Sequence, residues 1–252
     1  MVEQEQNRWS ELLPGERLDD LIIGGRKIIQ RPDQFCFSLD AILLAHFATV
    51  KPAMTAVDLG AGTGVLGLLL TARGAGAVTG VEINPEMAEM ANRSAAGNGL
   101  AGAVRTLAGD LRQIRELLPG GGWHLVVSNP PYRQTGSGYI TPRDSVAMAR
   151  HEITATLTDI VTAARYLLKY RGRFAMVHLP ERLADITTAM RQADIEPKRM
   201  QLVQPRSGQK PNMVLVEGVR GANPGLEVLP VLTVYNSDGG YDAAVSALYR
   251  DR

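Results

Sequence analysis

The segment Ser128-Asn129-Pro130-Pro131-Tyr132 combines residue types that suit a reaction at a planar amino group. Two successive prolines stiffen the backbone and remove two amide donors, which leaves a corner rich in hydrogen-bond acceptors. The side-chain oxygen of Asn129 and the carbonyl oxygen of Pro130 can each accept a hydrogen bond from one NH₂ group. Such acceptors favour a pyramidal nitrogen and stabilise the positive charge that develops as this nitrogen takes up a methyl group.

Tyr132 completes the segment, because its ring can stack on a planar target such as a nucleobase turned out of its helix. We therefore predict that Asn129, Pro130, Pro131 and Tyr132 form the catalytic segment. The alternative is structural: a rigid turn of two prolines followed by a tyrosine in the core. The position of the segment, directly after a predicted strand, favours the catalytic interpretation.

A glycine-rich stretch, Asp58-Leu59-Gly60-Ala61-Gly62-Thr63-Gly64, forms a second candidate site. It follows an apolar run typical of a buried strand and precedes a helical pattern. Glycines let the backbone turn sharply and let a ligand approach without a clash at Cβ. Glu82 ends the next predicted strand, where a carboxylate can accept hydrogen bonds from both hydroxyls of a ribose. These features predict a cofactor site at Asp58, Gly60, Gly62, Gly64 and Glu82.

The spacing of the glycines separates two cofactor classes. A nicotinamide dinucleotide is recognised by G-x-G-x-x-G, whereas this turn reads G-x-G-x-G. The charge of Asp58 also repels a pyrophosphate but suits a cationic ligand such as S-adenosylmethionine (SAM). The carboxylate of SAM can be held by amides at a helix N-terminus. We expect SAM, and we find no residue suited to a hydride-transfer site.

Two further residues complete the predicted cofactor site. Asp110 follows the third strand of the series and is placed to accept from the exocyclic amine of adenine. Asp110 also fits an N-cap for the following helix, and the two roles are compatible. Asn129 lies close enough in the predicted fold to contact the cofactor as well as the target amine.

Strand and helix patterns alternate through most of the chain. Strands are predicted at 55–59, 77–83, 104–108, 123–128, 173–178, 198–204, 213–219 and 229–235. Helices are predicted at 39–48, 65–72, 85–98, 111–118, 156–168, 180–192 and 241–249. This alternation predicts an α/β fold, with a mostly parallel seven-stranded sheet and helices on both faces. Residues 18–30 predict a hairpin, and Ser38 is predicted to cap the helix at 39–48.

We predict a division at residue 50. Residues 1–50 would form a hairpin-and-helix flap over the cofactor site, and residues 51–252 would form the catalytic domain.

These motifs resemble the Rossmann-like class I SAM-dependent methyltransferases that carry an NPPY-type motif. Within that superfamily the chain resembles the tRNA1(Val) (adenine(37)-N6)-methyltransferase family. This narrower resemblance rests on the stretches 16–21 (ERLDDL), 28–30 (IIQ), 35–41 (FCFSLDA), 149–152 (ARHE) and 196–199 (EPKR), and on Tyr241 and Tyr249.

The resemblance implies SAM-dependent methylation of N6 of an adenosine in tRNA, at position 37 beside the anticodon. By position, it also implies that Ser38 and Asp40 belong to an element that closes over the cofactor. The tRNA partner would contact basic residues near the target site or near proline-rich turns, namely Arg133, Arg143, Arg199, Arg206 and Lys210.

Other substrates fit the same chemistry. A glutamine side chain of a protein such as a release factor presents a planar NH₂ group, as do bases in ribosomal RNA or DNA. A non-catalytic tRNA-binding module is the option without an enzymatic activity.

The amino-acid composition excludes several other classes of protein. Apolar residues make up 45% of the 252 residues and charged residues 21%, which excludes a disordered or collagen-like chain. Residues 129–252 carry 16 Lys and Arg against 12 Asp and Glu, a small excess that suits an anionic partner. We expect a cytoplasmic protein, because the first residues are polar and acidic and no apolar run is long enough to span a bilayer. We expect no metal, because no His, Cys and Asp residues show ligand spacing.

Overall fold

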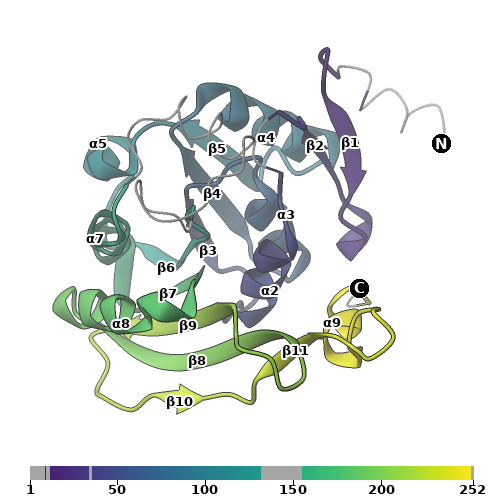
Figure 1. The fold of residues 1–252 in the computed structure, drawn as a ribbon. Coiled ribbons are helices and arrows are strands. Elements are labelled where there is room, and N and C mark those ends of the chain that lie inside the picture. Colours follow the sequence, from purple (N-terminus) through teal and green to yellow (C-terminus); the bar gives the residue numbers. More distant parts are fainter. Residues whose placement is uncertain (1–8, 10–11, 34–35, 132–154, 251–252) are drawn as a thin grey trace.

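A twisted sheet lies at the centre of the computed structural model, which describes residues 9, 12–33, 36–131 and 155–250 (Figure 1). Its strands are β3 (Thr55–Leu59), β4 (Ala77–Glu82), β5 (Val104–Ala108), β6 (Trp123–Ser128), β7 (Leu168–His178), β8 (Ile195–Arg206), β9 (Met213–Arg220), β10 (Glu227–Val228) and β11 (Leu232–Tyr235). Within the described residues, their order is β10-β8-β9-β7-β6-β3-β4-β5, and β11 also pairs with β8.

Most pairs in this sheet are parallel, and only β9 runs against its neighbours β7 and β8. The predicted mostly parallel α/β sheet is confirmed, but within the described residues it has nine strands rather than seven, because β10 and β11 join β3 to β9. The predicted strand at 229–235 is confirmed as β11, and together with β10 it extends the edge of the sheet at β8. The strands β3, β6, β7, β8 and β11 therefore all point their carboxyl ends to the same edge of the sheet.

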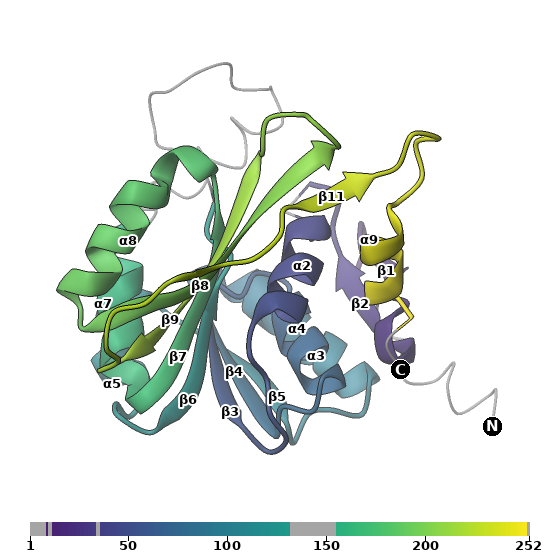
Figure 2. The same cartoon turned by 90° about the horizontal axis from the view of Figure 1, so that it is seen from below.

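Helices cover both faces of the sheet (Figure 2). One face carries α2 (Leu39–Phe47), α3 (Val65–Ala72) and α4 (Pro85–Gly97), and the other carries α5 (Ile114–Leu117), α7 (Leu157–Leu167) and α8 (Leu183–Gln192). Short 3₁₀ turns occupy η1 (Ile23–Gly25), η2 (Leu111–Gln113) and η3 (Pro180–Arg182), and α9 (Ala243–Leu248) follows β11. The predicted helix at 111–118 is thus divided into η2 and α5.

Buried side chains alternate between the two faces along each central strand. Leu125 and Val127 of β6 pack with α2 and α3, whereas Val126 packs with α7. Both sets of side chains are apolar because helices cover both sides, as expected for strands buried in a parallel sheet. This packing holds the strand ends in fixed relative positions.

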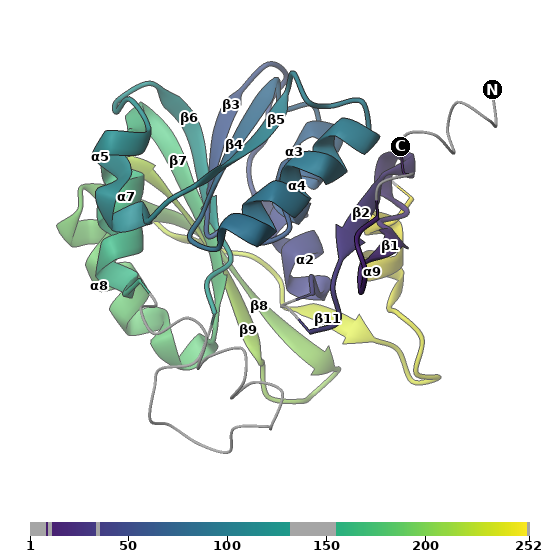
Figure 3. The ribbon, with the colours of Figure 1, turned by 90° about the horizontal axis from the view of Figure 1, so that it is seen from above.

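The predicted N-terminal hairpin is confirmed as β1 (Arg17–Asp20) and β2 (Lys27–Gln30). It packs against α4 (Figure 3). The amide of Ile29 donates to the hydroxyl of Ser94 at 3.0 Å, and the backbone of Lys27 exchanges two hydrogen bonds with the side chain of Asn98. A flap over the cofactor site and a domain boundary at residue 50 stay predictions.

A buried carboxylate ties the end of the N-terminal segment to the sheet. Glu217 of β9 is fully buried and accepts from the amide and the hydroxyl of Thr49, at 2.7 and 2.8 Å. The guanidinium of Arg173 on β7 lies 2.8 Å from the same carboxylate. Since a buried charge needs partners, this cluster fixes the position of Thr49 against β7 and β9.

No helix within the described ranges is long and apolar enough to cross a membrane.

The first prediction concerns Glu217. Replacing it with Ala leaves the half-buried Arg173 and the Thr49 amide without their shared acceptor, so we expect the free energy of unfolding to fall by about 3–5 kcal/mol. Urea denaturation measures this change. Glu227→Ala, which removes an exposed carboxylate from β10, is the matched control, with an expected change within about 0.5 kcal/mol. Equal effects of the two substitutions would contradict the role of Glu217.

Candidate functional site

Three loops meet at the carboxyl edge of neighbouring strands. The glycine turn follows β3, residues 83 and 84 follow β4, and Asn129 follows β6, with β6, β3 and β4 side by side in the sheet. Ligands of open α/β sheets bind outside the carboxyl ends of the strands. The structure therefore brings the two main predicted sites together at one edge.

The glycine turn adopts a backbone that only glycine tolerates well. Gly60, Gly62 and Gly64 all have positive φ, at 79°, 55° and 82°. A Cβ on Gly64 would lie 2.8 Å from Cβ of Ala91 on α4, so this glycine allows close packing of the turn. A Cβ on Gly60 would meet no described atom within 4 Å, so this part of the turn is open to a ligand.

Glu82 connects the glycine turn to the next loop. Its side chain is buried, with one oxygen accepting from the amide of Gly62 at 2.8 Å and the other from the amide of Asn84 at 2.9 Å. A carboxylate offers about four acceptor positions, so Glu82 keeps capacity for two further hydroxyl donors. The predicted position of Glu82 beside the turn is confirmed, and its ribose contact stays a prediction.

Asp58 is a buried acid without a compensating partner. It is 1% exposed, and neither carboxylate oxygen has a hydrogen-bond partner among the described residues. Burial, together with the nearby negative charge of Glu82, raises the pKa of Asp58 to about 8. A cation bound at the turn would favour the ionised form, so the site fits a positively charged ligand group.

The segment after β6 is held next to the glycine turn. The hydroxyl of Ser128 donates to the carbonyl oxygen of Leu59, the last residue of β3, at 2.8 Å, and both residues are fully buried. Asn129 is half-buried, Pro130 is buried and Pro131 is exposed. This bond places the predicted acceptor corner one strand away from the turn. Tyr132 lies outside the described residues, as do Arg133 and Arg143.

The carboxylate of Asp110 forms hydrogen bonds within its own loop. One carboxylate oxygen accepts from the amide of Arg112 at 2.9 Å, which confirms the predicted N-cap role. The Arg112 guanidinium pairs with the same carboxylate and holds the pKa of Asp110 below its usual range. Its contact with adenine stays a prediction.

Ser38 precedes α2 but does not cap it in the predicted way. Its hydroxyl donates to the carboxylate of Asp40 rather than accepting from a helix amide, so the predicted cap contact is wrong. The reason is that Asp40 is buried two residues later and draws the hydroxyl to itself. The role of Ser38 and Asp40 in holding a cofactor stays a prediction.

Ile83 was missed by the sequence analysis. It lies between Glu82 and Asn84 at the carboxyl edge, and its side chain is 47% exposed. An apolar side chain beside a strand-end carboxylate suits the flat face of a ligand ring. The signal was available in the sequence, because Ile83 extends the apolar strand pattern past Glu82 into the loop.

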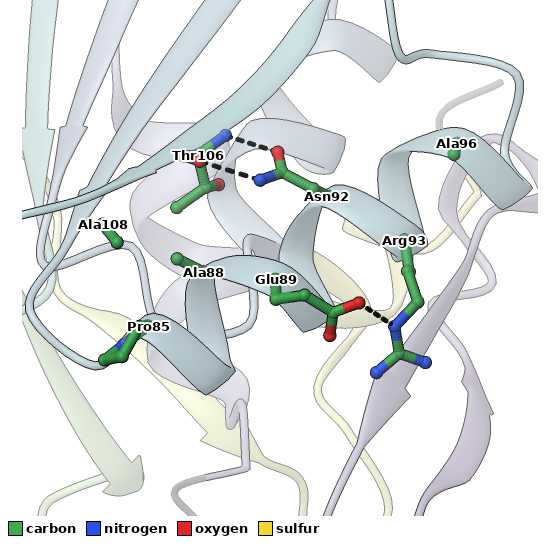
Figure 4. Close-up of a pocket in the computed structure, with 8 residues that line it drawn as sticks. All are labelled: Pro85, Ala88, Glu89, Asn92, Arg93, Ala96, Thr106 and Ala108. Atoms are coloured by element: carbon green, nitrogen blue, oxygen red, sulfur yellow. Dashed lines mark hydrogen bonds and ion pairs between the residues drawn. The ribbon is translucent and has the colours of Figure 1, made fainter. Parts of the chain in front are cut away.

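A pocket of about 430 Å³ lies elsewhere, between α4 and the edge strand β5 (Figure 4). The side chain of Asn92 crosses it and exchanges two hydrogen bonds with the backbone of Thr106, at 2.8 and 2.7 Å. These bonds satisfy part of the exposed strand edge. The lining residues include none of the predicted site residues.

Among the described residues, no group of three or more His, Cys, Asp or Glu side chains is arranged to hold a metal ion.

Comparison with known families gives a match to the methyltransferase small domain over residues 39–193. A protein of Porphyromonas gingivalis named tRNA1(Val) (adenine(37)-N6)-methyltransferase is 34% identical over 154 residues, which span 58% of this chain and 60% of that protein. A protein of the same name from Aeromonas hydrophila is 29% identical over 205 residues, spanning 80% of this chain and 83% of that protein.

Solved structures support the fold. The crystal structure of a predicted O-methyltransferase, Atu636 of Agrobacterium tumefaciens, has a TM-score of 0.69 at 24% identity, covering 84% of this chain and 96% of that chain. The YcgJ protein of Bacillus subtilis has a TM-score of 0.52 at 13% identity, covering 73% of this chain and 99% of that chain. At these identities the likeness concerns the fold alone.

The second prediction follows from the burial of Asp58. Its pKa is about 8 in the folded protein and about 3.9 in an unfolded chain, so the folded state binds more protons between these values. Asp58 therefore contributes stability that is complete below about pH 4 and is lost as the pH rises through about 8. We expect Asp58→Asn to remove this dependence, so that its stability relative to the unsubstituted protein increases from about pH 5 to about pH 8.

Urea denaturation across this pH range, without added ligand, measures the difference. Asp238→Asn, at an exposed position, is the control and is expected to follow the unsubstituted protein. If Asp58→Asn gave a curve parallel to that of the unsubstituted protein, the raised pKa would be wrong.

Proposed function

Because the chain belongs to the methyltransferase small domain family, we propose that it is a SAM-dependent methyltransferase that modifies N6 of an adenosine in tRNA. The adenosine is the one at position 37, beside the anticodon. Relatives that bear this activity in their names support the substrate. A tRNA substrate also agrees with the cytoplasmic location expected from the sequence.

The residues at the glycine turn fit SAM. Asp58 is a buried carboxyl whose ionised form a positively charged group would favour, and Gly60 leaves open space in front of the turn. Glu82 has acceptor capacity for the ribose hydroxyls, and Ile83 offers an apolar surface to the adenine ring. When bound, SAM supplies an electrophilic methyl group. Asp110, Ser38 and Asp40 complete the proposed cofactor set.

The acceptor corner acts on the target amine. The side-chain oxygen of Asn129 and the carbonyl oxygen of Pro130 each accept a hydrogen bond from one N–H of this amine, which directs the nitrogen lone pair to the cofactor. The same oxygens stabilise the positive charge that develops on nitrogen. Pro131 stiffens the corner, and Tyr132 is proposed to stack on the adenine. The proton leaves to water after transfer, so no general base is needed.

One observation carries this proposal: the buried hydrogen bond from Ser128 to Leu59. It holds the acceptor corner beside the glycine turn, as in-line transfer between two bound groups requires. A proline corner elsewhere on the surface would have no electrophile to act with.

The basic residues proposed for RNA binding divide into two groups. Arg206 ends β8, and Lys210 lies in the turn that follows, both at the carboxyl edge of the sheet. Arg199 lies further back in β8, where its guanidinium stacks on Phe47 and donates to the Phe47 carbonyl oxygen. We therefore propose phosphate contacts for Arg206 and Lys210, and a structural role for Arg199.

The third prediction tests the reaction. Purified protein is incubated with labelled SAM and, separately, with unmodified total tRNA, ribosomal RNA and a release factor. We expect N6-methyladenosine in tRNA, detected by mass spectrometry after digestion. Asn129→Ala removes one of the two acceptors and is expected to lower kcat by about 100- to 1,000-fold. Asn223→Ala, at an exposed loop position, is the matched control.

The outcomes separate the alternatives. Label in the release factor or in ribosomal RNA, and none in tRNA, would show that the labelled molecule is the substrate and that tRNA is not. Binding of tRNA with no methylation of any acceptor would favour a non-catalytic module.

The fourth prediction concerns Ile83. Ile83→Ala removes apolar surface proposed to cover the adenine ring, so we expect the KM for SAM to rise by about 10-fold with kcat little changed. Val231→Ala is the control, because Val231 is also 47% exposed but lies in the segment before β11. An unchanged KM for SAM would show that Ile83 does not contact the cofactor.

A further inference from the structure

Three tyrosines form a continuous stack near the end of the chain. The rings of Tyr235 and Tyr241 lie 5.6 Å apart with an angle of 16° between their planes, and those of Tyr241 and Tyr249 lie 5.5 Å apart with an angle of 14°. Tyr235 ends β11, and a β-bridge pairs it with Tyr241, while Tyr249 directly follows α9. The three rings are therefore held by a strand, a β-bridge and a helix end, which fix their backbone positions.

The two ends of the stack differ. Tyr249 packs against the apolar core beneath α2 and α9, and its burial raises its pKa above the ordinary value. Tyr241 has a ring on each side. Tyr235 is the outer end: it is 38% exposed, close to the 40% of Tyr241, and Tyr241 is the ring of the stack that contacts it, so the stack leaves its other face uncovered. Such a ring offers a planar surface whose position is already fixed, which lowers the entropy cost of binding a second ring.

The stack lies at the same edge of the sheet as the acceptor corner. Since β11 runs parallel to β8, and Tyr235 pairs with Arg206, Tyr235 lies at the carboxyl end of β8 (Figure 2). From β6 to β11 there are four strand spacings of about 4.8 Å, or roughly 19 Å. That distance excludes a role for Tyr235 at the reacting amine but suits contact with another part of a long substrate.

Positive charge lies beside the exposed ring. The guanidinium of Arg206 donates to the carbonyl oxygen of Asn236 at 2.9 Å, which holds it against the turn that follows Tyr235, and Lys210 follows in the β8–β9 turn. Asp238 and Asp242 also lie in this region, and their carboxylates accept from Ser237 and from the α9 amide of Ala244. A fixed aromatic face with adjacent cations is the combination that binds unpaired nucleotides.

We propose that Tyr235 stacks on an unpaired base of the RNA substrate, at a second contact about 19 Å from the target adenine. This inference rests on the proposed tRNA substrate. Arg206 and Lys210 would contact the phosphates that flank the stacked base. The surface would bind RNA without reading its sequence, because every base has a face that can stack.

The test measures tRNA binding separately from methylation. The Kd for an unmodified tRNA transcript is measured by filter binding in the absence of SAM. Tyr235→Ala is expected to raise this Kd by about 5- to 100-fold, whereas Tyr235→Phe, which keeps the ring, stays within about 2-fold. In steady-state assays, KM for tRNA rises for Tyr235→Ala and KM for SAM does not change. Tyr170→Ala is the control, since Tyr170 is 69% exposed in the amino half of β7.

A second measurement covers the case in which Tyr235→Ala does not fold, as judged by its thermal unfolding. Ultraviolet crosslinking of the unsubstituted protein to the transcript, followed by mass spectrometry, is expected to find RNA on the peptide that contains Tyr235. Equal Kd values for Tyr235→Ala and the unsubstituted protein, or crosslinks confined to other peptides, would overturn the proposed contact. If the unsubstituted protein methylates tRNA in that case, the proposed function stands without the stack. If it methylates no tRNA, both proposals fail.

Discussion

A buried hydrogen bond, from the hydroxyl of Ser128 to the carbonyl oxygen of Leu59, extends the pairing of β3 with β6 to the strand ends on which the site depends. Both groups are sealed from water, so breaking the bond would leave two unsatisfied polar atoms at a cost of about 1–3 kcal/mol each. The ends of β3 and β6 therefore cannot separate cheaply. Gly60 directly follows β3 and Asn129 directly follows β6, so the distance between the two strand ends also sets the distance between these residues. Transfer between two bound groups depends on such alignment, because small displacements of the reacting atoms cost large factors in rate.

The glycine turn shows a conflict between stability and binding. Asp58 is a buried acid with no partner among the described residues, close enough to Glu82 for the two charges to interact unfavourably. A leucine there would avoid burying an unpaired polar group, so the acid violates the packing rules that the rest of β3 obeys. Such violations concentrate at functional sites. With a pKa of about 8, Asp58 is mostly protonated near neutral pH, and a cationic cofactor bound at the turn would favour its ionised form.

Local patterns in the sequence predicted much of the fold, because they depend on neighbours in the chain. The glycine turn and the position of Glu82 followed from strand ends, and the helix at 65–72 matched α3. The Ser38 cap failed locally, because its hydroxyl pairs with Asp40 two residues later instead of accepting from an α2 amide. Other features depend on contacts between distant residues. The guanidinium of Arg199 donates to the carbonyl oxygen of Phe47, more than 150 residues away. The tyrosine stack could not be predicted for the same reason, since its rings meet only through the turn between β11 and α9.

The strand order itself arranges the parts of the proposed reaction. Along the carboxyl edge, β4 and β3 carry the cofactor residues, β6 carries the acceptor corner, and β8 with β11 carries the basic and aromatic residues. Between them, Glu217 of β9 pairs with Arg173 of β7 and joins these two strands inside the sheet. A small amide would use only the corner after β6, and would gain nothing from a fixed aromatic surface about 19 Å away. An extended polyanion with unpaired bases would use the whole edge, so the proposed Tyr235 contact and the proposed tRNA substrate require the same strand order.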